Sequence, residues 1–138
     1  MMATETQHQA AVIKWSQQPH IRQKWPELAL LYHIKNETKE GARQVAVDKS
    51  MGVKKGVPDL HLPVARGAYH SLYIEMKTPN GRPSSEQLWW RDRLEEQGNA
   101  WCICYGWKEA VSVLENYMGM GDYSVGEICI PLGTPSAE

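Results

Sequence analysis

The passage from residue 71 to residue 106 constrains the fold more than any other part of the sequence. It consists of an apolar run, SLYIEMK (71–77), a polar segment of helical character (83–98), and a second apolar run, AWCICYG (100–106). A strand, a helix and another strand in succession make a crossover connection, which joins parallel neighbours of one sheet. We therefore expect the two apolar runs to form parallel strands.

The ends of the crossover helix are marked by residues that favour helix termini. Ser84 is a good N-cap residue, Gln87 stands three positions later as in a capping box, and Gly98 follows the last helical residue. The same capping pattern at residues 4–7 predicts a first helix over 5–18. We also expect a strand at 28–36, a short helix at 39–52 and an amphipathic helix at 107–119.

Two further runs, 59–64 and 71–77, are joined by the short connection ARGAYH, which favours an antiparallel hairpin. A hairpin combined with the parallel crossover gives a mixed central sheet flanked by helices on both faces, an α/β fold. We assign residues 1–118 to one domain and 119–138 to a C-terminal tail, with a possible short strand at 127–132.

Composition limits the function classes. The 138 residues are 42% apolar and 22% charged, which is ordinary for a soluble globular protein. No apolar run approaches the roughly 18 residues of a membrane span, and the polar N-terminus is unlike a signal peptide. We therefore expect a cytoplasmic protein without a membrane partner. A net charge of −1 argues against a binder that relies on bulk positive charge, although basic residues can still gather on one face.

The three cysteines fit a reducing compartment. Cys102 and Cys104 lie in an apolar run, and Cys129 lies in the C-terminal tail. Packing as reduced thiols is favoured over a zinc site or a disulfide framework.

Two acids and a lysine stand out on the hairpin. Alternation places Glu75 and Lys77 on the same strand face, about 7 Å apart. Pro58 extends the entry into the partner strand, so Asp59 is its first residue and comes near Glu75. Two close carboxylates repel unless a proton or a cation lies between them, and Mg²⁺ or Mn²⁺ suits such oxygen ligands. A surface ion pair between Glu75 and Lys77 is the alternative.

With these residues, Gly56-Val57-Pro58-Asp59 followed by Ile74-Glu75-Met76-Lys77, the chain resembles the PD-(D/E)XK nuclease superfamily, and within it the VRR-NUC (virus-type replication-repair nuclease) family. The resemblance covers nearly all of residues 4–118. It implies a restriction-endonuclease-like core and a Mg²⁺- or Mn²⁺-dependent DNA endonuclease of phage or prophage type. It also implies Asp59, Glu75 and the Met76 carbonyl as metal ligands and Lys77 as the catalytic lysine.

Three further matches to the family pattern carry alternatives. Glu5, followed by Gln7 or Gln9, corresponds to an acid that reaches the metal through water, or it is an acid favoured by the helix dipole. The pair Asn36-Glu37 corresponds to a family motif, or it is a plain turn. Gln87 corresponds to a site glutamine, and it also serves the capping box.

Several basic residues flank the motif and are candidates for phosphate contacts. We assign DNA binding to Lys49, Lys54, Lys55 and Arg82, and Arg91 and Arg93 lie nearby. Each of them taken alone is equally a solvated surface charge.

Small members of this family resemble Holliday-junction resolvases. A four-way junction must be cut on two strands, and a C₂ homodimer supplies two sites related by the same kind of axis. Trp89 or Trp107 is a candidate for the dimer face, with ordinary core packing as the alternative. The rival functions are a monomeric flap or end-processing nuclease and a catalytically inactive junction-binding protein.

Overall fold

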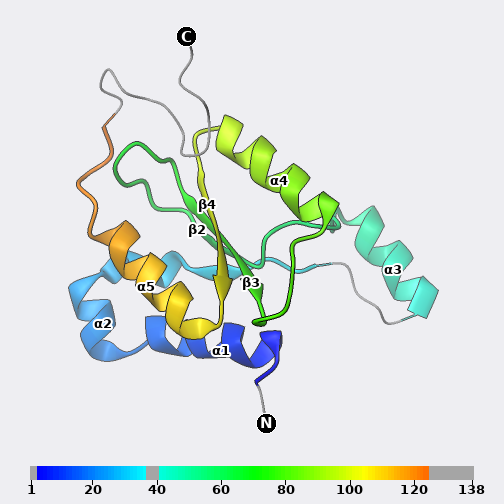
Figure 1. Ribbon diagram of the computed structural model, residues 1–138, viewed down its shortest axis with the longest axis horizontal. Coiled ribbons are helices and arrows are strands. Elements are labelled where there is room, and N and C mark those ends of the chain that lie inside the picture. The colour runs from blue at the N-terminus through cyan, green and yellow to red at the C-terminus, as the bar shows by residue number, and fades with distance from the viewer. Residues whose placement is uncertain (1–2, 37–40, 125–138) are drawn as a thin grey trace.

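The computed structural model describes residues 3–36 and 41–124, and its centre is a four-stranded sheet in the order β1-β2-β3-β4 (Figure 1). The strands are β1 (Tyr32–His33), β2 (Leu60–Leu62), β3 (Leu72–Lys77) and β4 (Ala100–Tyr105). The helices are α1 (Glu5–Ser16), α2 (Pro19–Lys24), the 3₁₀ helix η1 (Pro26–Leu30), α3 (Gly41–Ser50), α4 (Ser85–Glu96) and α5 (Trp107–Met118).

The sheet is mixed, as the sequence predicts. β2 and β3 are antiparallel, with Leu60 opposite Ile74, and the crossover through α4 makes β3 and β4 parallel, with Leu72 opposite Ala100. β1 joins the edge of the sheet antiparallel to β2. β3 continues beyond its pairing with β2, at the end of the sheet where Asp59 lies.

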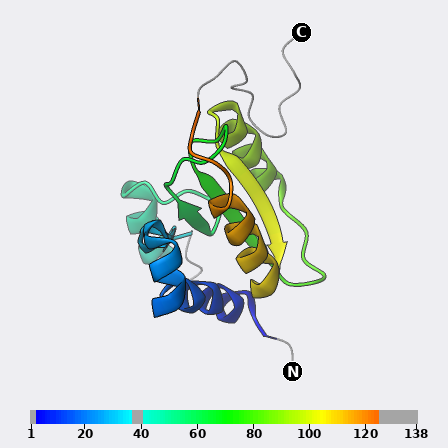
Figure 2. The same ribbon diagram turned by 90° about the vertical axis from the view of Figure 1, so that its left-hand side faces the viewer.

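The two faces of the sheet are covered by different helices (Figures 1 and 2). Leu72, Ile74 and Met76 are buried in the main core, and α1 and α5 supply Val12 and Leu114 to the same cluster. α4 packs on the other face, which is the one that carries Glu75. Because helices cover both faces of the sheet, β3 buries apolar side chains on one face and the acid Glu75 on the other.

Both predicted capping boxes are present. Thr4 and Gln7 exchange side-chain and backbone hydrogen bonds at the start of α1, and Ser84 and Gln87 do so at the start of α4. The first helix ends at Ser16, two residues earlier than predicted. Proline then starts a new helix, α2, because its fixed φ suits the first helical position.

The predicted strand at 28–36 is wrong over most of its length. The chain forms η1 as far as Leu30 and then only the two-residue β1. Proline at the first position of η1 favours a helical start, and Leu28 turns into the core at 1% exposure. The apolar run therefore reflects burial of a turn of 3₁₀ helix rather than a strand.

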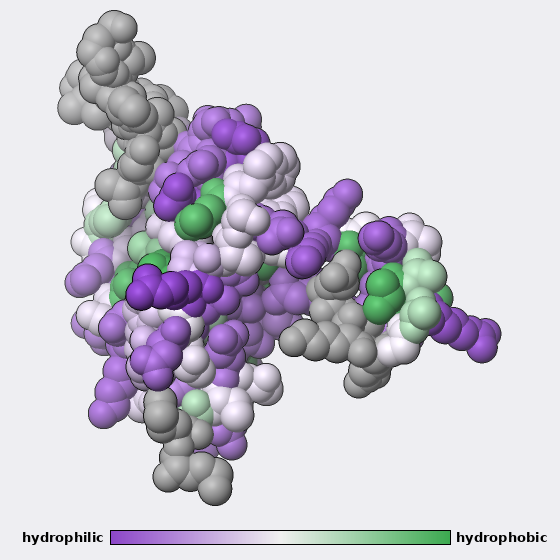
Figure 3. Space-filling model, turned by 45° about the vertical axis from the view of Figure 1, so that its right-hand side comes forward, coloured by the Kyte–Doolittle hydropathy of each residue, from purple (hydrophilic) through white to green (hydrophobic). Residues whose placement is uncertain are grey.

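The predicted short helix at 39–52 corresponds to α3. Gly52 follows it with φ of +92°, a conformation that favours glycine after a helix end. α3 stands out from the rest of the molecule, and Figure 3 shows apolar side chains on this part. Val47 and Met51 are among its exposed apolar residues.

The segment after α5 returns to the β2–β3 connection. The Gly67 N–H donates to the Gly121 carbonyl, and the Ser124 N–H donates to the Gly67 carbonyl. The possible strand at 127–132 and Cys129 lie outside the described residues. Cys102 and Cys104 are free thiols, as predicted. In the described ranges, no helix has the length and apolar character needed to cross a bilayer.

Candidate active site

Asp59 lies immediately before β2, at the position opposite Glu75. The register that pairs Leu60 with Ile74 places these two acids across from each other. The Met76 N–H donates to Asp59 Oδ2 at 2.7 Å, so the carboxylate takes the place of the ladder partner that β2 no longer supplies. This hydrogen bond fixes the Asp59 carboxylate against β3 at the end of the hairpin.

Asp59 is held from the β1 side as well. Its Oδ1 accepts a hydrogen bond from Asn36 Nδ2 at 3.0 Å, and its backbone carbonyl accepts from the Ile34 N–H at 2.9 Å. The His33 imidazole also lies 2.9 Å from that carbonyl. The two carboxylate oxygens of Asp59 therefore each accept one hydrogen bond, Oδ2 from the Met76 N–H and Oδ1 from Asn36, and each keeps a lone pair for a further partner.

Glu75 is buried, at 2% exposure. Its Oε2 accepts a hydrogen bond from Gln87 Nε2 at 3.0 Å and lies 3.9 Å from Lys77 Nζ. Its Oε1 is buried and has no hydrogen-bond partner among residues 3–36 and 41–124. A buried acceptor without a partner costs free energy unless a proton or a cation satisfies it.

The surroundings of Glu75 favour a proton on this acid. Burial, followed by the negative charge of Asp59 and the hydrogen bond that only a protonated Glu75 can donate to Asp59, raises the pKa of Glu75 from 4.5 to about 9. Lys77 acts in the opposite direction but does not outweigh these causes. Glu5 adds a small further increase, which shows that the first helix brings its acid within electrostatic reach of the hairpin.

Gln87 performs both of the jobs that its sequence context allows. Its backbone N–H donates to Ser84 Oγ at 3.1 Å, and its side-chain Oε1 accepts from the Ser84 N–H at 2.8 Å. The same side chain uses its Nε2 to hold Glu75. The start of α4 and the buried acid are therefore joined through one amide group.

A polar cleft of about 670 Å³ opens beside Asp59. It is lined by Glu5, Thr6, Gln9, His33, Lys35, Asn36, Asp59 and Met76. Of the two glutamines that could follow Glu5 in the family pattern, Gln9 lines this polar cleft and Gln7 serves the capping box. Glu37, the second residue of the Asn36-Glu37 pair, lies outside the described residues. Glu75 and Lys77 do not line this cleft, and their side chains are 3% and 12% exposed.

The sequence did not point to His33 and Lys35 as residues of the polar cleft. They alternate along the segment that contains β1, so both project to one side, and Asn36 follows directly. This alternation of polar side chains was the signal in the sequence that could have identified them. The predicted strand over 28–36 did not indicate that this segment lies beside Asp59.

The donor set suits a hard divalent cation. Within the described ranges, no group of three or more His, Cys, Asp and Glu side chains is arranged as a metal site. Asp59, Glu75 and a backbone carbonyl would instead provide two carboxylates and one further oxygen, and Mg²⁺ characteristically completes such a set with water. The unsatisfied Oε1 of Glu75 is the observation that supports the fit.

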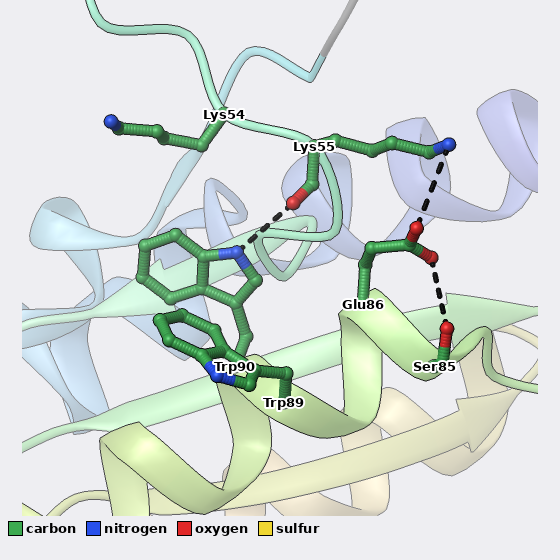
Figure 4. A pocket seen from close by; sticks show the side chains of 6 residues that line it. All are labelled: Lys54, Lys55, Ser85, Glu86, Trp89 and Trp90. Atoms are coloured by element: carbon green, nitrogen blue, oxygen red, sulfur yellow. Dashed lines mark hydrogen bonds and ion pairs between the residues drawn. The ribbon is translucent and has the colours of Figure 1, made fainter.

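The predicted phosphate-binding residues occupy separate places. Lys49 is exposed on α3, and Arg82 is exposed in the loop before α4. Lys54 and Lys55 line a second cavity, together with Trp89 (Figure 4). The remaining two arginines pair with acids on their own helix: Arg91 with Asp92 and Arg93 with Glu96.

Comparisons with known proteins identify the family. The profile of the VRR-NUC domain matches residues 3–108, which include Glu5, Asp59, Glu75, Lys77 and Gln87. A solved structure described as a VRR_NUC domain protein superposes with a TM-score of 0.76 at 30% sequence identity, covering 95% of this chain and 98% of that chain. Among the curated proteins, none matches this chain.

Proposed function

The chain belongs to the VRR-NUC family of PD-(D/E)XK nucleases, and from that premise we propose that it is a divalent-metal-dependent, structure-specific endodeoxyribonuclease that cuts four-way DNA junctions as a homodimer. The observation that carries the proposal is the pair of opposed carboxylates, Asp59 and Glu75, with one buried oxygen unsatisfied and Lys77 beside them. The resemblance alone supports a phage- or prophage-encoded enzyme that acts in the cytoplasm of a bacterial host.

Asp59, Glu75 and the Met76 carbonyl would hold the Mg²⁺ or Mn²⁺, with Glu5 reaching it through water across the polar cleft. A bound divalent ion supplies charge stabilisation at the phosphate and lowers the pKa of a coordinated water. Because the raised pKa of Glu75 favours its protonated form in the absence of the ion, binding of the ion to this carboxylate requires that the proton leave.

The protein's own side chains orient the reacting groups. Asn36 and the Met76 N–H fix the Asp59 carboxylate, and Gln87 fixes Glu75 by its Oε2. Lys77, mostly buried, offers a cation whose ammonium can position or deprotonate the attacking water, or neutralise charge that builds on the phosphate. Gln87 acts on the acid rather than on the substrate and is thus a positioning residue.

Symmetry and charge support the junction and the dimer. The motif provides one active site per chain, whereas resolving a junction needs two cuts on opposing strands. A protein of net charge −1 attracts linear duplex weakly, so its affinity must come from the fit between a shaped surface and a bendable substrate.

A nicking assay on a labelled four-way junction tests the proposal, with Mn²⁺ or Mg²⁺ added to metal-free protein. We expect paired nicks on opposing strands, little competition from linear duplex, and a sedimenting mass about twice the 15.7 kDa of the chain. A monomer that trims flaps and ignores junctions would support the rival nuclease. Junction binding without metal-dependent cleavage would support an inactive binding protein.

A further inference from the structure

A second cavity lies where the loop before β2 meets the first turns of α4 (Figure 4). This tryptophan pocket has a volume of about 580 Å³ and is lined by Lys54, Lys55, Ser85, Glu86, Trp89 and Trp90. The Trp90 indole N–H donates to the Lys55 carbonyl at 3.0 Å and so ties the loop to the helix. Both walls come from segments that also carry active-site residues.

The loop and α4 are in close contact at Gly56. A side-chain carbon at Gly56 would lie 2.7 Å from the Glu86 Cβ and 2.8 Å from its backbone carbon, and the φ of +87° also favours glycine. Only a residue without a side chain allows this approach. The tryptophan pocket is therefore a fixed feature of the fold rather than a gap between loosely placed segments.

Trp89 presents an aromatic surface in this pocket, with 53% of the residue exposed. Its ring lies edge-to-face with Trp90 at 5.6 Å, and the Arg93 guanidinium stands 5.5 Å from its centre. Lys55 is 66% exposed and pairs with Glu86 at 3.7 Å, whereas Lys54 forms no ion pair with any described residue. An exposed indole beside an ammonium group without an ion pair in the described ranges, that of Lys54, is a combination that binds unpaired nucleotides.

We propose that the tryptophan pocket binds an unpaired base of the DNA substrate, stacked on Trp89, with the adjoining phosphate held by Lys54. The indole offers a flat apolar surface that any base can cover, and the lysine offers a cation for the backbone. This inference rests on the proposed action on DNA and specifies its substrate as DNA with a displaced or unpaired nucleotide, which a branch point provides.

The position of the pocket fits that assignment. Lys55 and Asp59 are four residues apart, so their Cα atoms are separated by at most about 14 Å of extended chain. At about 3.4 Å per nucleotide along a duplex strand, the pocket is within roughly four nucleotides of the phosphate that a divalent ion at Asp59 would hold. α4 places Gln87 on Glu75 and Trp90 on Lys55, so the helix joins the two sites.

A second copy of the chain is a poorer occupant. A twofold contact centred on this pocket would bring together two surfaces that each carry two lysines, Lys54 and Lys55, against one acid, Glu86, and this excess of like charge opposes association. DNA supplies the opposite charge and a stacking partner together.

The test is binding of a labelled duplex with a single bulged thymidine, compared with the same duplex carrying an abasic bulge, in chelator so that no cleavage occurs. For the parent, removing the base should weaken binding by about 5- to 150-fold, the range for base–aromatic stacking. Trp89→Ala should weaken binding of the bulged duplex to a similar degree and lose the discrimination, while Trp89→Phe should keep part of it. Lys54→Ala should reduce the slope of log affinity against log salt by about 1 without removing the discrimination.

Leu30→Ala is the matched control, because Leu30 is 50% exposed on η1, outside the pocket. Equal affinity of the parent for both duplexes, or no binding of either, would overturn the inference. Discrimination that survives in Trp89→Ala, or a Trp89→Ala protein that merely changes from dimer to monomer in sedimentation, would also overturn it. Metal-dependent nicking by the parent is measured separately, so base discrimination without nicking would reject the nuclease proposal and keep the pocket.

Discussion

The polar cleft and the tryptophan pocket have no described lining residue in common, although only the segment 56–58 separates Lys55 from Asp59, and their stability costs differ. The polar cleft and Glu75, which lies opposite Asp59 in the hairpin, combine residues from distant parts of the chain, among them Glu5 and Asn36, and leave a buried oxygen without a donor. The tryptophan pocket uses two short segments whose polar side chains are exposed. A buried acid opposes folding when it ionises, whereas an exposed indole opposes it little. Substitutions in the two regions should therefore separate chemistry, metal binding and stability.

The largest effect is expected from Lys77→Ala. Loss of the ammonium beside Glu75 should reduce cleavage by about 10²- to 10⁴-fold, as for removal of a positioned acid–base group. Junction affinity should stay within a few-fold, since one cation is a small part of the phosphate interaction. Single-turnover cleavage and anisotropy binding measure the two quantities. Lys108→Ala removes an exposed lysine on α5 as a control; cleavage by Lys77→Ala at the parental rate would reduce Lys77 to an ion-pair partner.

Metal affinity is the next largest effect. Calorimetry should show Mn²⁺ binding to the parent and little binding to Glu75→Ala. Because the pKa of Glu75 is raised to about 9, the ion must displace its proton, so the parental affinity should rise by up to about tenfold per pH unit between about pH 6 and pH 8. Equal Mn²⁺ binding by the two proteins would remove Glu75 from the set of ligands.

The smallest effect concerns stability in chelator. The pKa of Glu75 is about 9 in the folded state against an ordinary 4.5, so between these values unfolding releases a proton and the parent loses stability as pH rises. Glu75→Gln has no such proton. The difference in free energy of unfolding between Glu75→Gln and the parent should therefore increase in favour of the variant by more than about 1 kcal/mol from about pH 5 to pH 8, because one pKa unit corresponds to about 1.4 kcal/mol.

Urea titrations of both proteins across this pH range measure the difference. A difference that stays constant with pH would show that Glu75 is ionised in the folded protein. Trp89→Ala, with an exposed side chain, should show no such pH-dependent gain.

The sheet could be predicted from the sequence because its signals are local. The capping residues at both ends of α4 and the apolar runs around it required a parallel crossover, and the hairpin spacing placed Asp59 opposite Glu75. The chemical pattern of two acids and a lysine then led to the family.

The rest of the site depends on contacts that alternation and propensity do not encode. Asn36 donates to Asp59 from a position beyond β1, which ends at His33, whereas the apolar run at 28–36 predicted a strand as far as Asn36. The tryptophan pocket depends on the approach of Gly56 to Glu86, a contact between segments about 30 residues apart that no periodicity indicates. Charge identified Lys54 as a candidate for DNA binding, and residue type identified Trp89 as a candidate for a dimer face, but only the fold brings the two together.

The double role of Gln87 restricts which amino acid position 87 accepts. For a helix start alone, glutamate and glutamine are interchangeable at the third position of a capping box. Here the side-chain oxygen faces the Ser84 N–H while the nitrogen donates to Glu75. Glutamate would preserve the first contact and replace the second with a repulsion between acids. A redesign of α4 for thermal stability that chose residues by helix preference alone would thus keep a well-formed helix and lose the hydrogen bond that positions Glu75.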